Sequence, residues 1–227
     1  MAERKAGSKP GAKAAEVTPA TVVATGVGKS IDGNVLLRPI DLSVPEGRCV
    51  VLRGANGSGK TTLLKILAGT LEPSEGTATV DGATADERDP AVRRTVAALI
   101  GSPTAYRDLT LVDHLVLIEA TWGRGEYANE RAEALLETLE IGHLFDRFPH
   151  ELSSGQQQLF HLSMVLSRPS RVMLLDEPEQ RLDTHKRALL ADLLVERKQS
   201  GTAIVVACHD PELTERIADR VVQIIPG

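Results

Sequence analysis

The segment that most constrains the fold of this chain is a glycine-rich loop between an apolar run and a helical pattern. The apolar run covers residues 49–52, and residues 63–68 repeat leucine and isoleucine at helical spacing. The loop and the residue after it read Gly54, Ala55, Asn56, Gly57, Ser58, Gly59, Lys60, Thr61 and Thr62. A strand, a G-x-x-x-x-G-K-[ST] loop and a helix in this order predict a phosphate-binding loop.

Phosphate binding explains the residue types in the loop. Glycines let the backbone turn tightly, so that its N–H groups reach phosphate oxygens, and a helix starting near Lys60 adds the positive end of its dipole. In such a loop Lys60 reaches the β- and γ-phosphates, and Thr61 places its hydroxyl on Mg²⁺. A glycine-rich turn without a ligand is the alternative interpretation. The four fixed positions and the two flanks together argue against it.

The composition indicates one globular domain. The chain has 227 residues, of which 42% are hydrophobic and 25% charged, and this length is enough to bury a substantial core. A net charge of −5 gives no general attraction to nucleic acid, so no nucleic-acid partner is expected. Cys49 and Cys208 lie in apolar runs, which favours reduced thiols over a disulfide. No apolar run reaches the ~18–20 residues of a membrane span, so a role at a membrane requires a partner.

The first part of the chain changes from a polar tail to short strands. Residues 1–20 are rich in Ala, Lys, Gly and Pro and predict a disordered basic tail, with an arm that binds nucleic acid or lipid headgroups as the alternative. Residues 21–24 and 40–44 predict strands around a turn at 32–34, and residues 77–80 predict another strand. These strands indicate a small antiparallel β part on the N-terminal side of the domain.

The rest of the chain is helical in its middle third and then alternates. The helical pattern from 109 to 144 is interrupted at 123–125 and predicts an inserted helical subdomain over about residues 102–168. A further helix is expected at 156–166, and after the subdomain we expect strands at 172–175, 203–207 and 221–225 and helices at 184–198 and 211–218. Alternating strands and helices predict a mostly parallel sheet with helices on both faces. We therefore expect an α/β domain over residues 21–227.

Two acidic residues follow the apolar run 172–175. Asp176 ends the run, and the carboxyl end of a buried parallel strand is where such sheets place their ligands. An acid there predicts a group that holds Mg²⁺ through its water shell. Glu177, the next residue, is placed to position and polarise an attacking water. A pair of exposed acids that opens a turn before Pro178 is the alternative.

A second polar segment contains Ser153, Ser154, Gly155 and Gln156. Taken locally it is the N-terminal cap of a helix, in which a serine accepts hydrogen bonds from free backbone N–H groups. A helix start of this kind can also bind an anion, and nothing local says which one.

These segments together resemble the motifs of the ATP-binding cassette (ABC) ATPases, and the resemblance covers residues 22–225. Residues 152–156 resemble the signature motif, although Ser154 replaces its usual second glycine. Residues 54–61 match the Walker A motif, and residues 172–177 match the Walker B motif with its catalytic glutamate. Asp183 resembles the aspartate of the D-loop, and His209 matches the switch histidine that contacts the γ-phosphate.

The resemblance implies a P-loop NTPase core and a site shared between two chains. In this family two cassettes meet head to tail, and the signature loop of one closes on the γ-phosphate held by the other. The implied activity is hydrolysis of ATP with Mg²⁺, with Glu177, His209 and Lys60 in catalysis. The implied partners are a second cassette, identical or paralogous, and an integral membrane transporter subunit that holds the chain at the cytoplasmic face of the cell membrane. The alternative is a dimerising cassette with weak turnover in a regulatory or non-transport role.

The chain departs from the family pattern around the loop. Ile31 stands where an aromatic residue usually stacks on adenine, which predicts weaker or less base-selective nucleotide binding. The Q-loop glutamine, which normally helps hold the metal and the attacking water, falls near Gly101, and we expect slow but real turnover with Ser102 or a water as a substitute. Leu159 and Met164 stand where basic residues are common, which predicts that the two acids after residue 175 lack charge partners.

Overall fold

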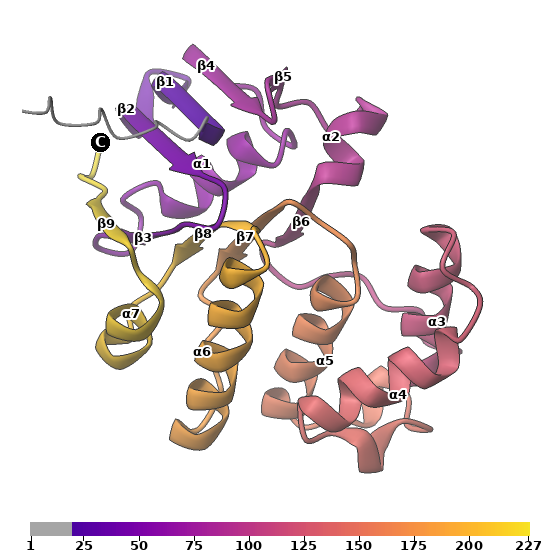
Figure 1. The fold of residues 1–227 in the computed structure, drawn as a ribbon. Coiled ribbons are helices and arrows are strands. Elements are labelled where there is room, and N and C mark those ends of the chain that lie inside the picture. Colours follow the sequence, from indigo (N-terminus) through magenta and orange to yellow (C-terminus); the bar gives the residue numbers. More distant parts are fainter. Residues whose placement is uncertain (1–19) are drawn as a thin grey trace, which may run out of the picture.

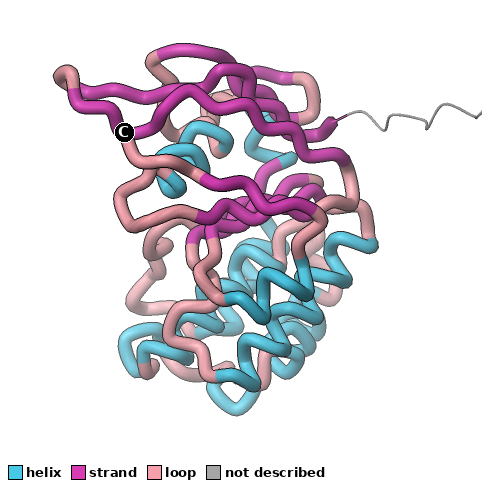
Figure 2. Tube along the Cα trace, turned by 90° about the vertical axis from the view of Figure 1, so that its left-hand side faces the viewer, coloured by secondary structure: helices cyan, strands magenta, loops and turns pink. Residues whose placement is uncertain are grey.

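The computed structural model describes residues 20–227, so the predicted basic tail lies outside the described residues except for its last position. Figures 1 and 2 show two layers of strands at one end of the domain and most of the helices at the other. The mostly parallel sheet, the small antiparallel sheet and the helices confirm the predicted α/β class. The predicted bounds of the domain and of its helical subdomain stay predictions.

The larger sheet has five parallel strands. Their order across the sheet is β6 (Val96–Leu99), β7 (Val172–Asp176), β8 (Ala203–Ala207), β3 (Cys49–Arg53) and β9 (Arg220–Gln223). All neighbouring pairs are parallel. The three central strands are buried along nearly their whole length. Because helices cover both faces of such a sheet, its strands are continuous apolar runs rather than alternating ones.

The smaller sheet is antiparallel and comes from the N-terminal side, as expected. Its order is β2 (Asn34–Pro45), β1 (Ala20–Ile31), β4 (Glu75–Val80) and β5 (Ala83–Thr84). Asp32 and Gly33 join β1 to β2, with φ of 50° and 80°, as a two-residue hairpin turn requires. The turn is confirmed, but both strands are much longer than predicted.

One helix lies between the two sheets. In α1 (Lys60–Leu67) the leucines and Ile66 are fully buried in a cluster that includes side chains of both sheets. A helix that is apolar on several sides is stable only when it is enclosed in this way. The phosphate loop is therefore attached to an element that is fixed from both sides. A short helix, α2 (Pro90–Thr95), begins at the N-cap Asp89 and had not been predicted.

The remaining helices lie on the other side of the parallel sheet from α1, with α3 and α4 beside α5 (Figure 1). They are α3 (Leu111–Thr121), α4 (Ala128–Thr138), α5 (Ser154–Leu166), α6 (Thr184–Gln199) and α7 (Pro211–Ile217), with 3₁₀ turns at Gly142–Leu144 and Pro149–Glu151. The predicted break at residues 123–125 separates α3 from α4, and both pack against each other and against α5. No helix in residues 20–227 is long and apolar enough to cross a bilayer.

The two cysteines belong to the core, as predicted. Cys49 and Cys208 are both buried and form no disulfide. Burial raises the pKa of each thiol to about 12. Both side chains therefore stay protonated at neutral pH and behave as small apolar groups.

Candidate functional site

The predicted site residues of four segments lie at one edge of the parallel sheet. The phosphate loop follows β3, Asp176 ends β7, and His209 lies two residues after the end of β8. Gly101 lies two residues after the end of β6. Because β6, β7, β8 and β3 are neighbours and run parallel, their carboxyl ends meet there. This edge is where parallel sheets bind ligands.

Two positions in the loop require glycine. A Cβ at Gly54 would lie 2.5 Å from the Ile224 carbonyl oxygen, because the loop passes against the chain after β9. Gly59 has φ of 102°, and a Cβ there would lie 2.5 Å from the Leu36 carbonyl oxygen. An L side chain at either position would clash with backbone, and at Gly59 it would also be strained. The loop is thus fixed between β2, β9 and α1.

Lys60 lies along the inside of this loop. The residue is only 5% exposed, and Nζ donates hydrogen bonds to the carbonyl oxygens of Gly54 at 2.9 Å and Ala55 at 3.1 Å. Within residues 20–227 it forms no salt bridge. The buried hydroxyl of Ser58 likewise has no hydrogen-bond partner in this part of the chain. A buried ammonium held only by carbonyl oxygens, beside an unpaired hydroxyl, is suited to an anion.

Thr61 and Asp176 form a pair of oxygen donors. The Thr61 hydroxyl donates a hydrogen bond of 2.6 Å to Asp176 Oδ2, while the buried Oδ1 has no partner among the described residues. Burial raises the pKa of Asp176, the hydrogen bond from Thr61 opposes this, and the charge of Glu177 adds to it. Mg²⁺ prefers oxygen ligands of this kind, here the Thr61 hydroxyl and the two carboxylate oxygens of Asp176. The residues therefore fit this ion.

The Glu177 carboxylate is held by two side chains from different segments. Its Oε1 lies 3.2 Å from His209 Nε2, and its Oε2 accepts a hydrogen bond from Gln180 Nε2. The backbone at Glu177 has φ of 49°, which L residues rarely adopt, and its N–H donates to the Ala207 carbonyl oxygen at 2.8 Å. The sequence predicted that Glu177 lacks a charge partner, and the structure instead places the His209 imidazole against its carboxylate.

A cavity of about 230 Å³ opens beside the two acids. Its lining residues are Thr61, Leu99, Gly101, Ser102, Gln158, Asp176, Glu177, Gln180 and Arg181. Sequence reasoning did not single out Gln158, Gln180 or Arg181. The only available signal was that Gln180 and Arg181 follow the acids closely along the chain, and this does not say which way their side chains point.

The predicted signature residues start α5. The Ser153 hydroxyl accepts from the Gln156 N–H at 3.4 Å, and Gln156 Oε1 accepts from the Ser153 N–H at 2.9 Å, which is a capping box. Ser153 and Ser154 are exposed, and none of the four residues lines the cavity beside the acids. Asp183 caps α6 by accepting from the Lys186 N–H at 2.8 Å. The local prediction of an N-terminal cap is confirmed.

Ile31 lies at the end of β1 and is 48% exposed. β1 pairs with β2 on one side, and the β2 residues Leu36 and Leu37 border Gly59 of the loop. An exposed apolar side chain therefore stands on the hairpin next to the phosphate loop.

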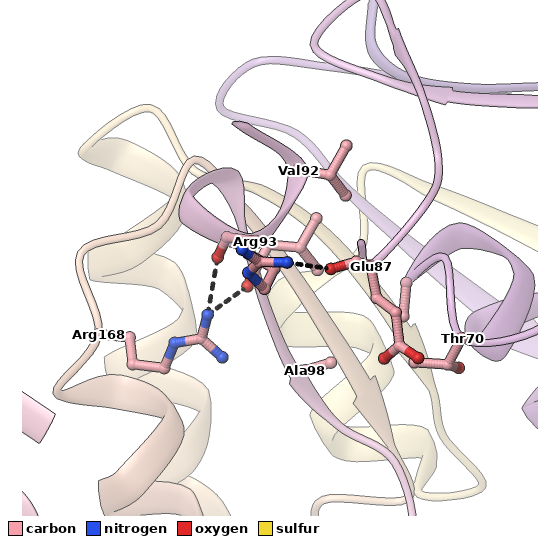
Figure 3. Close-up of a pocket in the computed structure, with 8 residues that line it drawn as sticks. Thr70, Glu87, Val92, Arg93, Ala98 and Arg168 are labelled. Carbon is pink, nitrogen blue, oxygen red and sulfur yellow. Dashed lines mark hydrogen bonds between the residues drawn. The ribbon is translucent and has the colours of Figure 1, made fainter. Parts of the chain in front are cut away.

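Another cavity, shown in Figure 3, contains none of the predicted site residues. It lies between the end of α1, α2 and β6 and also measures about 230 Å³. Arg168 Nη2 donates to the carbonyl oxygens of Arg93 and Val96 at 2.9 Å each, and Arg93 donates to that of Glu87. These arginines are tied to backbone, so the candidate site remains at the carboxyl edge of the sheet.

The fold and the site define a P-loop α/β nucleotide-binding protein. The family model described as "ABC transporter" matches residues 37–180, and the chain belongs to this family. It is 35% identical to an aliphatic sulfonates import ATP-binding protein of Rhizobium johnstonii, over 92% of this chain and 75% of that protein. It is 33% identical to a glutamate transport ATP-binding protein of Corynebacterium efficiens, over 89% of this chain and 86% of that protein.

Longer relatives and solved structures agree with this placement. A Streptomyces coelicolor protein described as an ABC transporter ATP-binding protein is 38% identical over 84% of this chain, which spans only 34% of that protein. The solved ATP-binding subunit of an ABC transporter has a TM-score of 0.82 at 27% identity and covers 90% of this chain and 86% of its own. A bacterial ABC transporter cassette solved as a dimer has a TM-score of 0.80 at 23% identity, with coverage of 89% and 94%.

Proposed function

We propose that this chain is an ATP-binding and hydrolysing subunit that dimerises on ATP and powers transport by a separate membrane subunit. The observation that carries the proposal is the grouping of Thr61, Asp176 and Glu177 beside the phosphate loop, with His209 on the Glu177 carboxylate. It places oxygen donors for Mg²⁺ and a base in one cavity, at the point where the phosphate loop leads into α1.

Each residue has a distinct task in this proposal. The loop N–H groups of residues 54–62 and Lys60 bind the phosphates, and Ile31 packs on the base. Thr61 and Asp176 hold Mg²⁺, which when bound neutralises charge on the phosphates. Glu177 accepts a proton from the water that attacks the γ-phosphorus, and His209 contacts the γ-phosphate. The water oxygen ends on phosphate and the leaving oxygen stays on ADP.

A second copy of the chain, or a paralogue, completes the site. The start of α5 is exposed, and its residues do not line the cavity of their own chain. The N-terminus of a helix attracts anions, so residues 153–156 of the opposite chain are suited to the γ-phosphate. Asp183, also exposed, lies across the same interface. A related cassette has been solved as a dimer, which supports this arrangement.

The proposal of a membrane partner is supported by the descriptions of the relatives, and we place the contact with it near Gly101. Several relatives are described as import or transport ATP-binding proteins. We propose that residues 102–168 form a helical subdomain that contacts the membrane subunit and holds the domain of residues 21–227 at the cytoplasmic face. An ATP-dependent dimer with weak turnover and a regulatory role is the second candidate, because Gly101 supplies no side chain where the family has glutamine.

Incubating the full chain with ATP and Mg²⁺ is expected to release phosphate and to convert monomers to dimers. Sedimentation velocity follows the association of the 24.3 kDa chain, and a phosphate assay follows turnover. ADP is the control, because it lacks the γ-phosphate that the second chain would contact. Dimers that form without phosphate release support the second candidate. If the chain forms no dimers and releases no phosphate, both candidate functions are contradicted.

Replacing Ile31 by Tyr is expected to tighten ATP binding by about two- to tenfold, because a ring stacked on adenine adds about 0.5–1.5 kcal/mol beyond area burial. Ile31 is exposed at a strand end, where a tyrosine is accommodated without repacking. Equilibrium titration with ATP and with GTP measures both affinity and base selectivity. Unchanged ATP affinity would show that this side chain does not pack on the base.

A further inference from the structure

The cavity beside the acids lacks a side chain at the place where the family has its Q-loop glutamine. Gly101 has φ of 72°, and a Cβ built there meets nothing within 4 Å. Ser102, the neighbouring residue, is exposed, and no hydrogen bond of its side chain is found in the described part of the chain. The side of the cavity formed by β6 and the residues after it therefore offers no carboxamide to the attacking water or to Glu177.

Gln180 brings a carboxamide to the same cavity from the turn after β7. Its Nε2 donates to Glu177 Oε2, while His209 Nε2 faces Oε1 at 3.2 Å. Both oxygens of this carboxylate are therefore engaged, by groups from two segments. Nε2 is a donor and the carboxamide oxygen is an acceptor, so the same side chain can also accept a hydrogen bond from a water beside Glu177.

The backbone that carries Gln180 is fixed at several points. The Gln180 N–H donates to the Glu177 carbonyl oxygen at 3.1 Å, which closes a turn through the buried Pro178. Gln158 Nε2 donates to the Pro178 carbonyl oxygen at 3.0 Å. The side-chain amide of Gln158 therefore donates to the backbone of the turn, whereas the side-chain amide of Gln180 donates to the Glu177 carboxylate. A side chain on a fixed turn holds a precise orientation at little entropic cost.

We propose that Gln180 is a positioning residue that orients the Glu177 carboxylate for ATP hydrolysis. In this role its carboxamide replaces that of the Q-loop glutamine, which is missing at Gly101. The proposal rests on the function proposed above, in which Glu177 is the base. Gln180 acts on the base and leaves the phosphate loop untouched. Its loss therefore slows turnover without weakening the binding of ATP.

Two variants of similar size separate the donor from the bulk of the side chain. In the full chain, Gln180→Met keeps the length and removes both polar atoms, and Gln180→Glu keeps the shape and replaces the donor by an acid facing Glu177. Both are expected to lower kcat by about tenfold or more, because a hydrogen bond to a charged group is lost. Gln180 is exposed, so folding is not at risk. Steady-state phosphate release gives kcat and KM, and equilibrium titration gives the affinity for ATP.

Two further variants make the result decisive. Gln199→Met replaces an exposed glutamine at the end of α6 and is expected to leave kcat unchanged. Glu177→Gln tests the base itself. If it abolishes turnover while Gln180→Met turns over like the wild type, the positioning role is overturned and the proposed function stands. If Glu177→Gln hydrolyses ATP normally, the proposed function itself fails. An equal loss of kcat and ATP affinity in the Gln180 variants would indicate a structural role and would also overturn the proposal.

Discussion

Replacing Glu177 by Gln is expected to lower ATP turnover by at least about 100-fold and to leave ATP bound. The amide has the size of the carboxylate and still reaches His209 and Gln180, but it cannot accept a proton from water. The substitution also removes a negative charge beside Asp176 and facing the phosphates, so the affinity for ATP stays equal or rises. Phosphate release measures turnover, and equilibrium titration measures binding.

The charge change needs its own control. Glu215 in α7 is exposed and does not line the cavity beside the acids, and Glu215→Gln removes one negative charge. This variant is expected to bind and hydrolyse ATP like the wild type. A Glu177→Gln chain with wild-type turnover would rule out Glu177 as the base. Loss of ATP binding together with turnover would assign it a structural role.

The strands of the parallel sheet and the helices around it were predictable because their sequence patterns are strong and local. β7 and β8 are short aliphatic runs bounded by polar residues, and a break at residues 123–125 separates two amphipathic helices. Such patterns do not depend on which elements pack together. For the same reason the phosphate loop was recognisable, since all of its positions are consecutive in the sequence.

The antiparallel sheet was only partly predictable. Most residues of β2 between Asn34 and Arg38 are exposed, and register irregularities in β1 near Ala24 and Val27 interrupt its alternation. Pairing with the partner strand, rather than a local apolar pattern, extends these strands. The six residues of α2 are too few to show a helical period, and only Asp89 and Pro90 indicate its start.

In the site, the residues that sequence reasoning missed depend on backbone geometry. Glu177 and Arg181 both have positive φ, of 49° and 63°, which turns the chain sharply between β7 and α6. Residue type gives little indication of such conformations, because these are neither glycine nor asparagine. The direction of Gln180 follows from this turn, so its contact with Glu177 could not be derived from spacing. The same holds for the contact of Gln158 with Pro178.

Mixing two inactive variants in equal amounts is expected to restore activity if two chains share each site. Lys60→Ala removes the buried cation of the phosphate loop, and Ser154→Glu places a negative charge where α5 would face the γ-phosphate. Each alone is expected to lose about 100-fold in turnover. Ser154→Glu is not expected to unfold its own helix, because an acid in the first turn is favourable to the helix dipole. Ser154→Ala, which adds no charge, is the matched control and should remain active.

The arrangement of the sites sets the size of the recovery. In a head-to-tail dimer of the two variants, one site carries both substitutions and the other carries neither. Random pairing makes half of the dimers mixed, so about a quarter of the wild-type sites are regained. A site built within one chain cannot be restored by mixing, and the mixture would then show only the mean phosphate-release rate of the two inactive proteins. The phosphate-release rate of the mixture therefore decides whether the exposed start of α5 acts on its own chain or on a neighbour.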